Sequence, residues 1–230
     1  MLVFADGAVL GTIGGGETES RVITHAMDAI QTGKSSLHSY TLADPHRGDP
    51  GICGGTLEIF VEPIMPEPTV IVIGAGHVGK AVAHLASWVG FRVVVCDDRG
   101  EFANPEQAPG GDDYLVVAME EIPTNFTIHS QTYIVITTRN AEIDVKGLPA
   151  LLATEAAYIG VIGSRRRWKL TQDKLVEAGI DLAALARVVS PMGLELNAES
   201  PEEIALSIMA EIVMLRMGGQ GGRMGDRGEA

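Results

Sequence analysis

The glycine-rich turn that follows a short apolar run is the feature that most constrains the fold. Residues 70–73 are continuously apolar, as in a buried parallel strand, and residues 74–79 read GAGHVG, a G-x-G-x-x-G pattern. Residues 78–89 then show helical periodicity, and residues 91–96 form a second strand-like run that ends before two aspartates. The glycine pattern alone is weak, but the elements in this order predict a Rossmann-type nucleotide-binding unit.

Each glycine of the turn has an expected role. Gly74 permits the tight turn, Gly76 lets the backbone approach a pyrophosphate, and Gly79 lets the helix pack closely on the strand. The helix N-terminus offers free amides and a partial positive charge to a phosphate. His77 lies inside this loop and faces the ligand or the neighbouring domain, or is an ordinary surface residue.

Two acids follow the second strand, where a carboxylate can hold ribose hydroxyls. Asp97 or Asp98 would repel a 2′-phosphate and so favours an NAD-like over an NADP-like ligand, while Arg99 partly offsets that repulsion. The alternative is a Rossmann fold with a vestigial pocket, because a fold does not by itself establish a function.

The pattern of elements changes at a cluster of prolines, at positions 63, 66 and 68, which indicates a stiff linker. We therefore expect an N-terminal domain over residues 1–65, a Rossmann-like domain over residues 69–216 and a disordered tail over residues 217–230. The fold class is α/β, with a C-terminal Rossmann-like, mostly parallel sheet preceded by a smaller α/β domain.

The expected elements are as follows. The N-terminal domain should hold a hairpin (residues 1–4 and 8–13), a helix (17–32) and two strands (36–42 and 56–61). The C-terminal domain should begin with the strand, helix and strand of the Rossmann unit, at residues 70–73, 78–89 and 91–96. It should also hold strands at 114–118, 133–137, 158–162 and 187–190, and helices at 149–155, 164–178 and 200–216.

Two segments of the N-terminal domain are candidate anion or metal sites. Gly14, Gly15 and Gly16 precede a helix and form either a second anion cradle or a flexible corner. Cys53 lies among glycines, a setting that favours a reactive thiolate suited to sulfur transfer or metal binding, or else it only fills a turn.

Three arginines directly after Ser164 oppose the dipole of the helix that they begin. An anion held by the helix amides and by guanidinium groups, Arg165 among them, would explain the misfit, and a solvated basic face is the alternative. Polar residues 137–140 follow a predicted central strand and are expected to line the same crevice as the glycine turn.

Composition excludes several classes of partner. With 17 basic and 30 acidic residues the formal net charge is 17 − 30 = −13, which disfavours binding to nucleic acid or to anionic membranes. The two cysteines form no C-x-x-C pair, and no apolar run approaches the roughly 20 residues of a membrane span. No signal peptide is recognisable, so we expect a cytoplasmic protein.

Taken together, the motifs resemble those of the XdhC/CoxI family. They are residues 11–16 (GTIGGG) with Glu17 and Glu19, residues 51–55, residues 72–79, residues 90–99, residues 158–165, residues 190–194 and residues 200–205. The likeness extends from residue 1 to about residue 216, but the stretch that family members carry before the position of Met1 is missing, so the N-terminal domain is expected to be truncated at its start.

The resemblance implies an accessory protein rather than an enzyme with its own turnover. Such proteins bind the molybdenum cofactor, a molybdopterin that can also occur in a dinucleotide form, help it receive sulfur from a cysteine desulfurase, and pass it to a molybdenum hydroxylase such as xanthine dehydrogenase. It also implies a homodimer, and places Cys53 near the molybdenum. The alternatives are an NAD-dependent oxidoreductase, for which no catalytic acid or base stands out, and a nucleotide-sensing regulatory module.

Overall fold

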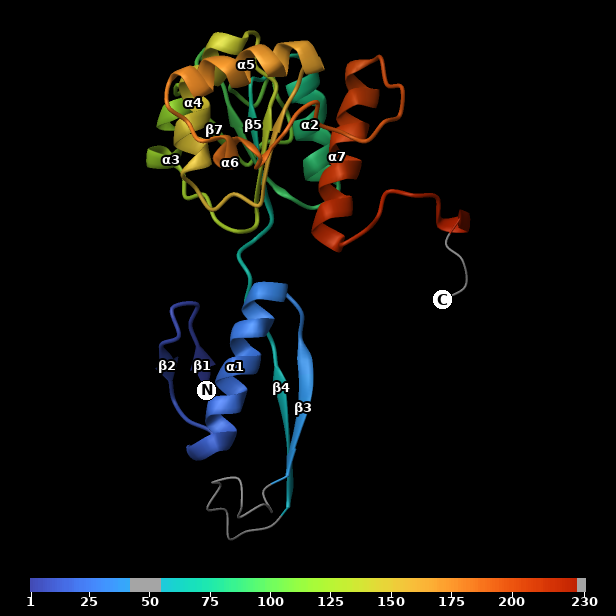
Figure 1. The fold of residues 1–230 in the computed structure, drawn as a ribbon. Helices are drawn as coiled ribbons and strands as arrows, with labels where there is room; N and C mark the ends of the chain where they lie inside the picture. Colours follow the sequence, from blue (N-terminus) through green and yellow to red (C-terminus); the bar gives the residue numbers. More distant parts are fainter. Residues whose placement is uncertain (42–54, 227–230) are drawn as a thin grey trace. The chain divides into compact units, whose positions relative to one another are not determined.

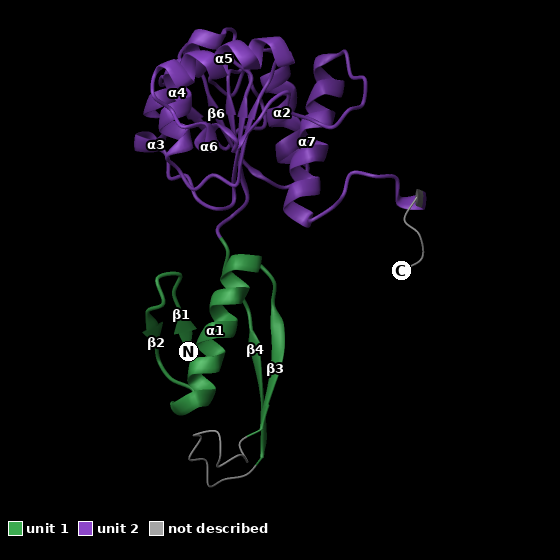
Figure 2. Ribbon diagram, viewed as in Figure 1, with its two compact units in different colours: residues 1–65 green, residues 66–230 purple. Residues whose placement is uncertain are grey.

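The computed structural model describes residues 1–41 and 55–226, and the chain divides into two compact units. Figure 2 colours them: unit 1 comprises Met1–Met65 and unit 2 comprises Pro66–Ala230. We describe each unit by itself. Cys53 lies outside the described residues.

Unit 2 is built on a six-stranded sheet, and every pair of neighbouring strands in it is parallel. The order is β10-β9-β8-β5-β6-β7. The strands are β5 (Thr69–Ile73), β6 (Arg92–Cys96), β7 (Asp113–Leu115), β8 (Thr132–Ile136), β9 (Tyr158–Val161) and β10 (Val188–Val189). After β7 the chain crosses over the sheet to begin β8 on the other side of β5, so the topological switch point of this Rossmann fold lies between β5 and β8. The predicted fold class is confirmed.

Helices cover both faces of this sheet, as Figure 1 shows. The helices α2 (His77–Trp88) and α7 (Pro201–Met217) pack on the face that carries Val70 and Val72. On the opposite face, α4 (Ala141–Leu152) and α5 (Arg165–Glu177) pack against Ile71 and Ile73. Successive residues of β5 thus enter two different apolar cores, which explains why the strand is continuously apolar.

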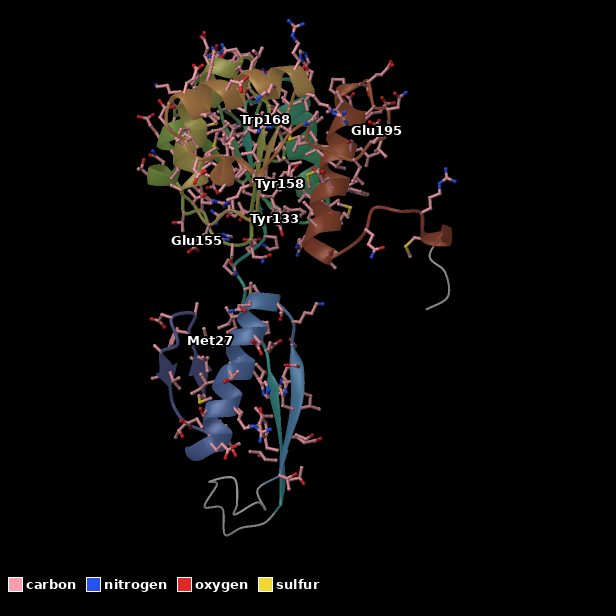
Figure 3. The ribbon with its side chains drawn as sticks, in the orientation of Figure 1. Met27, Tyr133, Glu155, Tyr158, Trp168 and Glu195 are labelled. Carbon is pink, nitrogen blue, oxygen red and sulfur yellow. The ribbon has the colours of Figure 1, made fainter. Side chains whose placement is uncertain are left out.

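Large aromatic side chains from a helix and from two strands contribute to these cores. Trp168 of α5 is buried with Leu175 against one face, and Tyr133 and Tyr158 belong to the other (Figure 3). The Tyr158 hydroxyl donates a 2.5 Å hydrogen bond to Glu211 of α7, whose same oxygen also accepts from the backbone of Gly193. A buried hydroxyl therefore finds the partner that its burial requires.

Sequence reasoning was wrong about the start of α4. The helix begins at Ala141 rather than near residue 149, because the Asn140 side chain accepts hydrogen bonds from the amides of Glu142 and Ile143. Three short elements were missed: η2 (Met119–Glu121), α3 (Ile122–Asn125) and α6 (Leu182–Leu185). By contrast, Ser164 and Ser200 cap α5 and α7 as their sequences predict.

Unit 1 packs one helix, α1 (Gly16–Thr32), against an antiparallel ribbon of β3 (Ser36–Thr41) and β4 (Thr56–Val61). A second small ribbon, β1 (Leu2–Val3) with β2 (Val9–Leu10), lies at the start of the chain. Val22 and Ala29 of α1, Tyr40 of β3 and Val61 of β4 are buried. The alternation along β3 and β4 gives the ribbon a covered and an exposed face.

In the C-terminal segment, α7 ends at Met217, where Gly218 adopts a left-handed conformation with a φ of 69°. A short 3₁₀ helix, η3 (Met224–Asp226), follows within the stretch expected to be disordered. Among the described helices, none is both long and apolar enough to cross a membrane.

Candidate functional site

A pocket of about 320 Å³ opens at the carboxyl end of the sheet in unit 2. This is the edge at which open α/β sheets bind ligands, and the volume lies within the usual range for a small-molecule site. Its walls come from the residues that follow β5, β6, β7 and β8, and from α4. The lining residues are Ile73, Gly74, Gly76, Asp97, Asp98, Arg99, Val117, Ala118, Met119, Glu120, Thr137, Thr138, Arg139, Ile143 and Lys146.

The glycine turn is tightly fitted to its surroundings on one side and open on the other. Gly74 has a φ of +98°, and a Cβ atom there would lie 2.8 Å from the carbonyl oxygen of Thr137. A Cβ atom on Gly79 would lie 2.0 Å from the carbonyl oxygen of Gly74, so the helix can approach the turn only without a side chain. A Cβ atom on Gly76 would meet nothing within 4 Å. Gly76 is therefore the open position, and it lines the pocket.

The first turn of α2 keeps its amides available. Gly76 is the N-cap residue, and it supplies no side chain to accept hydrogen bonds from the turn. The first intrahelical bond at this end runs from the Lys80 amide to the Gly76 carbonyl at 2.9 Å. The preceding amides and the helix dipole together favour an anion at this point.

Asp97 fixes the position of the glycine turn, and all of its acceptor sites are used in hydrogen bonds within the protein. Its carboxylate accepts hydrogen bonds from the backbone of Ala75 (3.0 Å) and Arg99 (3.1 Å), and from Nε and Nη2 of Arg99 (2.9 and 3.0 Å). A carboxylate offers about four acceptor sites, so these four bonds satisfy it. Its side chain is only 1% exposed. Protein groups therefore already use the oxygens of Asp97, and its binding of ribose hydroxyls stays a prediction.

Asp98 also lines the pocket, and its side chain is 43% exposed. Nη1 and Nη2 of Arg139 each donate a 2.8 Å hydrogen bond to one of its oxygens, forming a two-pronged ion pair. These hydrogen bonds lower the pKa of Asp98 to about 2, so it is ionised throughout the neutral range. Arg139 belongs to the segment 137–140 that the sequence placed at this crevice, and Thr137 and Thr138 also line it.

A third ion pair and an apolar wall complete the pocket. Lys146 of α4 pairs with Glu120 of η2, and Val117, Met119 and Ile143 provide the apolar surface. The lining thus contains three carboxylates and three cations, each cation paired with an acid. Sequence reasoning missed Glu120, Lys146 and the apolar residues, because they lie within η2, within α4 or between β7 and η2, where the sequence shows no motif.

The arginines after Ser164 do not line the pocket. Ser164 accepts a 3.2 Å hydrogen bond from the Arg167 amide as the cap of α5, and Arg165 and Arg166 are exposed. Arg167 instead turns inward, where Nη2 donates to Asp144 at 2.7 Å; the Asp144 side chain is 0% exposed. One arginine of the three therefore neutralises a buried acid, which is a structural reason for its place in the first turn of a helix.

The loop that precedes α1 in unit 1 binds an acid from the chain itself. Glu19 of α1 accepts hydrogen bonds from the amides of Ile13 (3.1 Å) and Gly15 (3.2 Å) and from the Thr12 hydroxyl (2.5 Å). These bonds, that from Thr12 first, lower the pKa of Glu19. Of Gly14, Gly15 and Gly16, which were predicted to form an anion cradle, Gly15 donates its amide to this internal carboxylate, so an external phosphate at that amide would have to displace Glu19.

His77, a predicted site residue that the structure describes, does not line the pocket. His77 is exposed at the first residue of α2. Burial raises the pKa of the Cys96 thiol to about 12, so this cysteine is an unreactive residue of the core. Among the described residues, no cluster of three or more histidine, cysteine or acidic side chains could hold a metal ion.

Comparison with known proteins adds sequence similarity to this geometry. Residues 70–212 match the XdhC Rossmann domain, and residues 1–41 match the XdhC and CoxI family. YqeB of Escherichia coli strain K12, described as uncharacterized, is 35% identical over 97% of this chain and 41% of its own length. A probable subunit of xanthine dehydrogenase from Bacillus subtilis strain 168 is 32% identical over 70% of this chain and 47% of its own length.

Among solved structures, a xanthine dehydrogenase of Bacillus halodurans is similar with a TM-score of 0.59 and 24% identity, covering 90% of this chain and 67% of that one. At this identity the likeness concerns the fold alone. The chain spans less than half the length of the two curated relatives.

Proposed function

This chain belongs to the XdhC and CoxI family, and on that basis we propose that it binds a phosphate-bearing molybdenum cofactor and delivers it to a molybdenum hydroxylase such as xanthine dehydrogenase. It would then act as an accessory protein, with no turnover of its own. The bound form would be molybdopterin or its dinucleotide.

The partner class rests on the names of similar proteins. A curated relative that shares 32% identity is described as a probable subunit of xanthine dehydrogenase. An accessory chain that serves such an enzyme would need to hold the cofactor and release it. As finer parts of the same proposal, a cysteine desulfurase would supply the terminal sulfur, and the chain would act as a homodimer.

The single observation that carries the cofactor proposal is the open backbone at Gly76. A molybdopterin carries a phosphate, and its dinucleotide form carries a pyrophosphate. Either group can reach the free amides at a helix N-terminus only where no side chain blocks the way. A Cβ atom at Gly76 would touch nothing within 4 Å, and this residue lines the pocket. Gly76 and the first turn of α2 would hold the phosphate, and Val117, Met119 and Ile143 would cover an apolar ring face. When bound, the group supplies the molybdenum that the recipient hydroxylase uses.

The same geometry disfavours the NAD-dependent alternative. NAD binding to this fold uses an acid after the second strand to hold two ribose hydroxyls. Asp97 occupies that position, but its four acceptor sites are already used by Ala75 and Arg99. A ribose would have to displace a buried ion pair, at a cost in free energy.

Reconstitution tests the proposal. The purified full chain, loaded with molybdenum cofactor, is incubated with a cofactor-free molybdenum hydroxylase, and the hydroxylase activity is compared with that obtained from free cofactor at the same concentration. We expect faster or more complete activation with the loaded chain. Failure to bind the cofactor, together with activation no better than that by free cofactor, would overturn the proposal.

A further inference from the structure

The ion pair between Asp98 and Arg139 bridges two strands that are not neighbours. Strands β6 and β8 lie on either side of β5. Asp98 comes two residues after the end of β6, and Arg139 comes three residues after the end of β8. Their two 2.8 Å hydrogen bonds therefore connect the flanks of β5 at the edge of the sheet where Gly74 begins the turn.

We propose that Asp98 competes with the ligand for Arg139, so that a phosphate group binds this pocket by taking over the guanidinium from the carboxylate. This inference rests on the proposed function, because it assigns the residue pair that a phosphate-bearing cofactor would rearrange. Asp98 is then a specificity-determining residue, because an anion enters the pocket only if it binds Arg139 more strongly than this carboxylate does.

Arg139 is the arginine in the pocket that can change partners at low cost. Its side chain is 46% exposed and that of Asp98 is 43% exposed, so water can solvate either group after the pair separates. Arg99 differs, because its partner Asp97 is 1% exposed and would be left as an uncompensated buried charge. Arg99 also stacks on Phe102, with 3.8 Å from the guanidinium carbon to the ring centroid.

The chemistry of both side chains fits an exchange with phosphate. A guanidinium group binds carboxylate and phosphate through the same planar pair of donors, so Arg139 can move from one to the other with its fork intact. Asp98 stays ionised at neutral pH, because its pKa is about 2. It therefore competes for Arg139 throughout the neutral range.

Lys146 is less suited to this role. It pairs with Glu120 at the pocket, but its side chain is 73% exposed and its ammonium group is a flexible point charge. It lies on α4 rather than after a strand that flanks β5. We therefore assign the exchange to Arg139, and Lys146→Gln serves as a variant that removes a pocket cation without touching the Asp98–Arg139 pair.

Binding of inorganic pyrophosphate, measured by isothermal titration calorimetry on the full chain, tests the inference. Asp98→Asn should tighten binding by about fivefold, the scale of an exposed ion pair, and Arg139→Gln should weaken it by at least as much. In the Arg139→Gln background, Asp98→Asn should have little further effect, because the competition it relieves is already gone. Lys146→Gln should weaken binding less than Arg139→Gln.

The matched control is Asp173→Asn, which removes one carboxylate from the exposed pair between Lys169 and Asp173 on α5. It changes the net charge as Asp98→Asn does and should leave pyrophosphate binding unchanged. Circular dichroism and the urea midpoint confirm that each variant is folded, which the exposure of all these side chains leads us to expect.

Four results would overturn the inference: no change with Asp98→Asn, an equal gain with Asp173→Asn, the same gain with and without Arg139, or no binding of pyrophosphate by any variant. The third would show plain charge repulsion. The failure of the proposed function is separate, because a chain that binds pyrophosphate as described but binds no molybdenum cofactor would keep the exchange and lose the cofactor role.

Discussion

The backbone amide of Ala75 donates a 3.0 Å hydrogen bond to Oδ2 of Asp97, which ties the glycine turn after β5 to the end of β6. Arg99 completes the arrangement by donating to both carboxylate oxygens of Asp97. An acid that looks like a ligand-binding residue in the sequence therefore supports the turn that a ligand would meet.

Replacing this acid should destabilise the turn. Asp97→Asn leaves Arg99 without its buried counter-ion, and we expect the free energy of unfolding to fall by about 3 kcal/mol, as for removal of one partner of a buried pair. Urea denaturation measures the change, and hydrogen exchange at the Ala75 amide should become faster. Asp113→Asn is the control: it removes an acid from the half-exposed pair with Arg92 and should cost less than about 1 kcal/mol. Equal losses in the two variants would contradict this role for Asp97.

The two glycines at the start of α2 should respond differently to alanine. In Gly79→Ala the new methyl group would collide with the Gly74 carbonyl, and we expect a loss of roughly 1–3 kcal/mol or more of stability. In Gly76→Ala the methyl group enters open space at an ordinary φ of −72°, so the melting temperature should stay nearly constant while anion binding weakens. Thermal unfolding and pyrophosphate titration of both variants check this, and unimpaired binding by Gly76→Ala would count against the pocket.

The buried acid of α4 should be one of the costliest positions to change. Asp144 is 0% exposed and bonds to Arg167 and to the hydroxyl of Thr138. Asp144→Ala leaves the guanidinium of Arg167 without its counter-ion, so we expect a loss of about 3–5 kcal/mol. Chemical denaturation gives the value. The control is Arg166→Gln, an exposed residue next to Arg167 in the first turn of α5, which should change the free energy of unfolding by less than about 0.5 kcal/mol. A small effect at Asp144 would mean that the pair contributes little to the fold.

The stability of unit 1 should fall in mild acid. The His25 ring stacks on His38 at a centroid distance of 3.7 Å, and its Nδ1 lies 2.6 Å from the Tyr40 hydroxyl. Burial, then the charges of His38 and Arg21, lowers the pKa of His25, which Asp28 opposes. The unfolded chain therefore takes up a proton first, near pH 6.5, and stability is lost as the pH falls below that value.

Nuclear magnetic resonance can follow this titration on the full chain. The ring resonances of His25 should titrate below pH 6.5, and hydrogen-exchange protection in α1 and β3 should decrease between about pH 7 and pH 5.5. His25→Gln should reduce the pH dependence, whereas His84→Gln, at an exposed position of α2, should leave it unchanged. An ordinary or raised pKa for His25 would contradict the stacked, half-buried arrangement of its ring.

The sequence was most informative where the signal is local. The strand, glycine turn and helix over residues 70–88 were predictable because each glycine meets a steric demand within the same unit, and the caps at Ser164 and Ser200 are read within four residues. The start of α4 was also signalled locally, by Asn140 followed by the acids Glu142 and Asp144, but Asn140 was interpreted only as part of the crevice lining.

Pairings across the chain could not be read from a single sequence. Asp97 and Asp98 are chemically identical, and only the packing of the strand decides which of them turns inward toward Ala75. The pairing of Arg139 with Asp98, 41 residues apart, and that of Arg167 with Asp144, 23 residues apart, depend on tertiary structure. The interaction of Glu19 with the glycine loop was within reach of the sequence, since the acid lies only four residues after Gly15.

The most direct test of the account is an equilibrium titration of isolated molybdenum cofactor against the wild-type chain and the Gly76→Ala variant. The account predicts saturable binding to the wild type and clearly weaker binding to Gly76→Ala, with both proteins equally folded. No saturable binding to the wild type, or equal binding to the two proteins, would contradict the claim that the open backbone at Gly76 receives the cofactor phosphate.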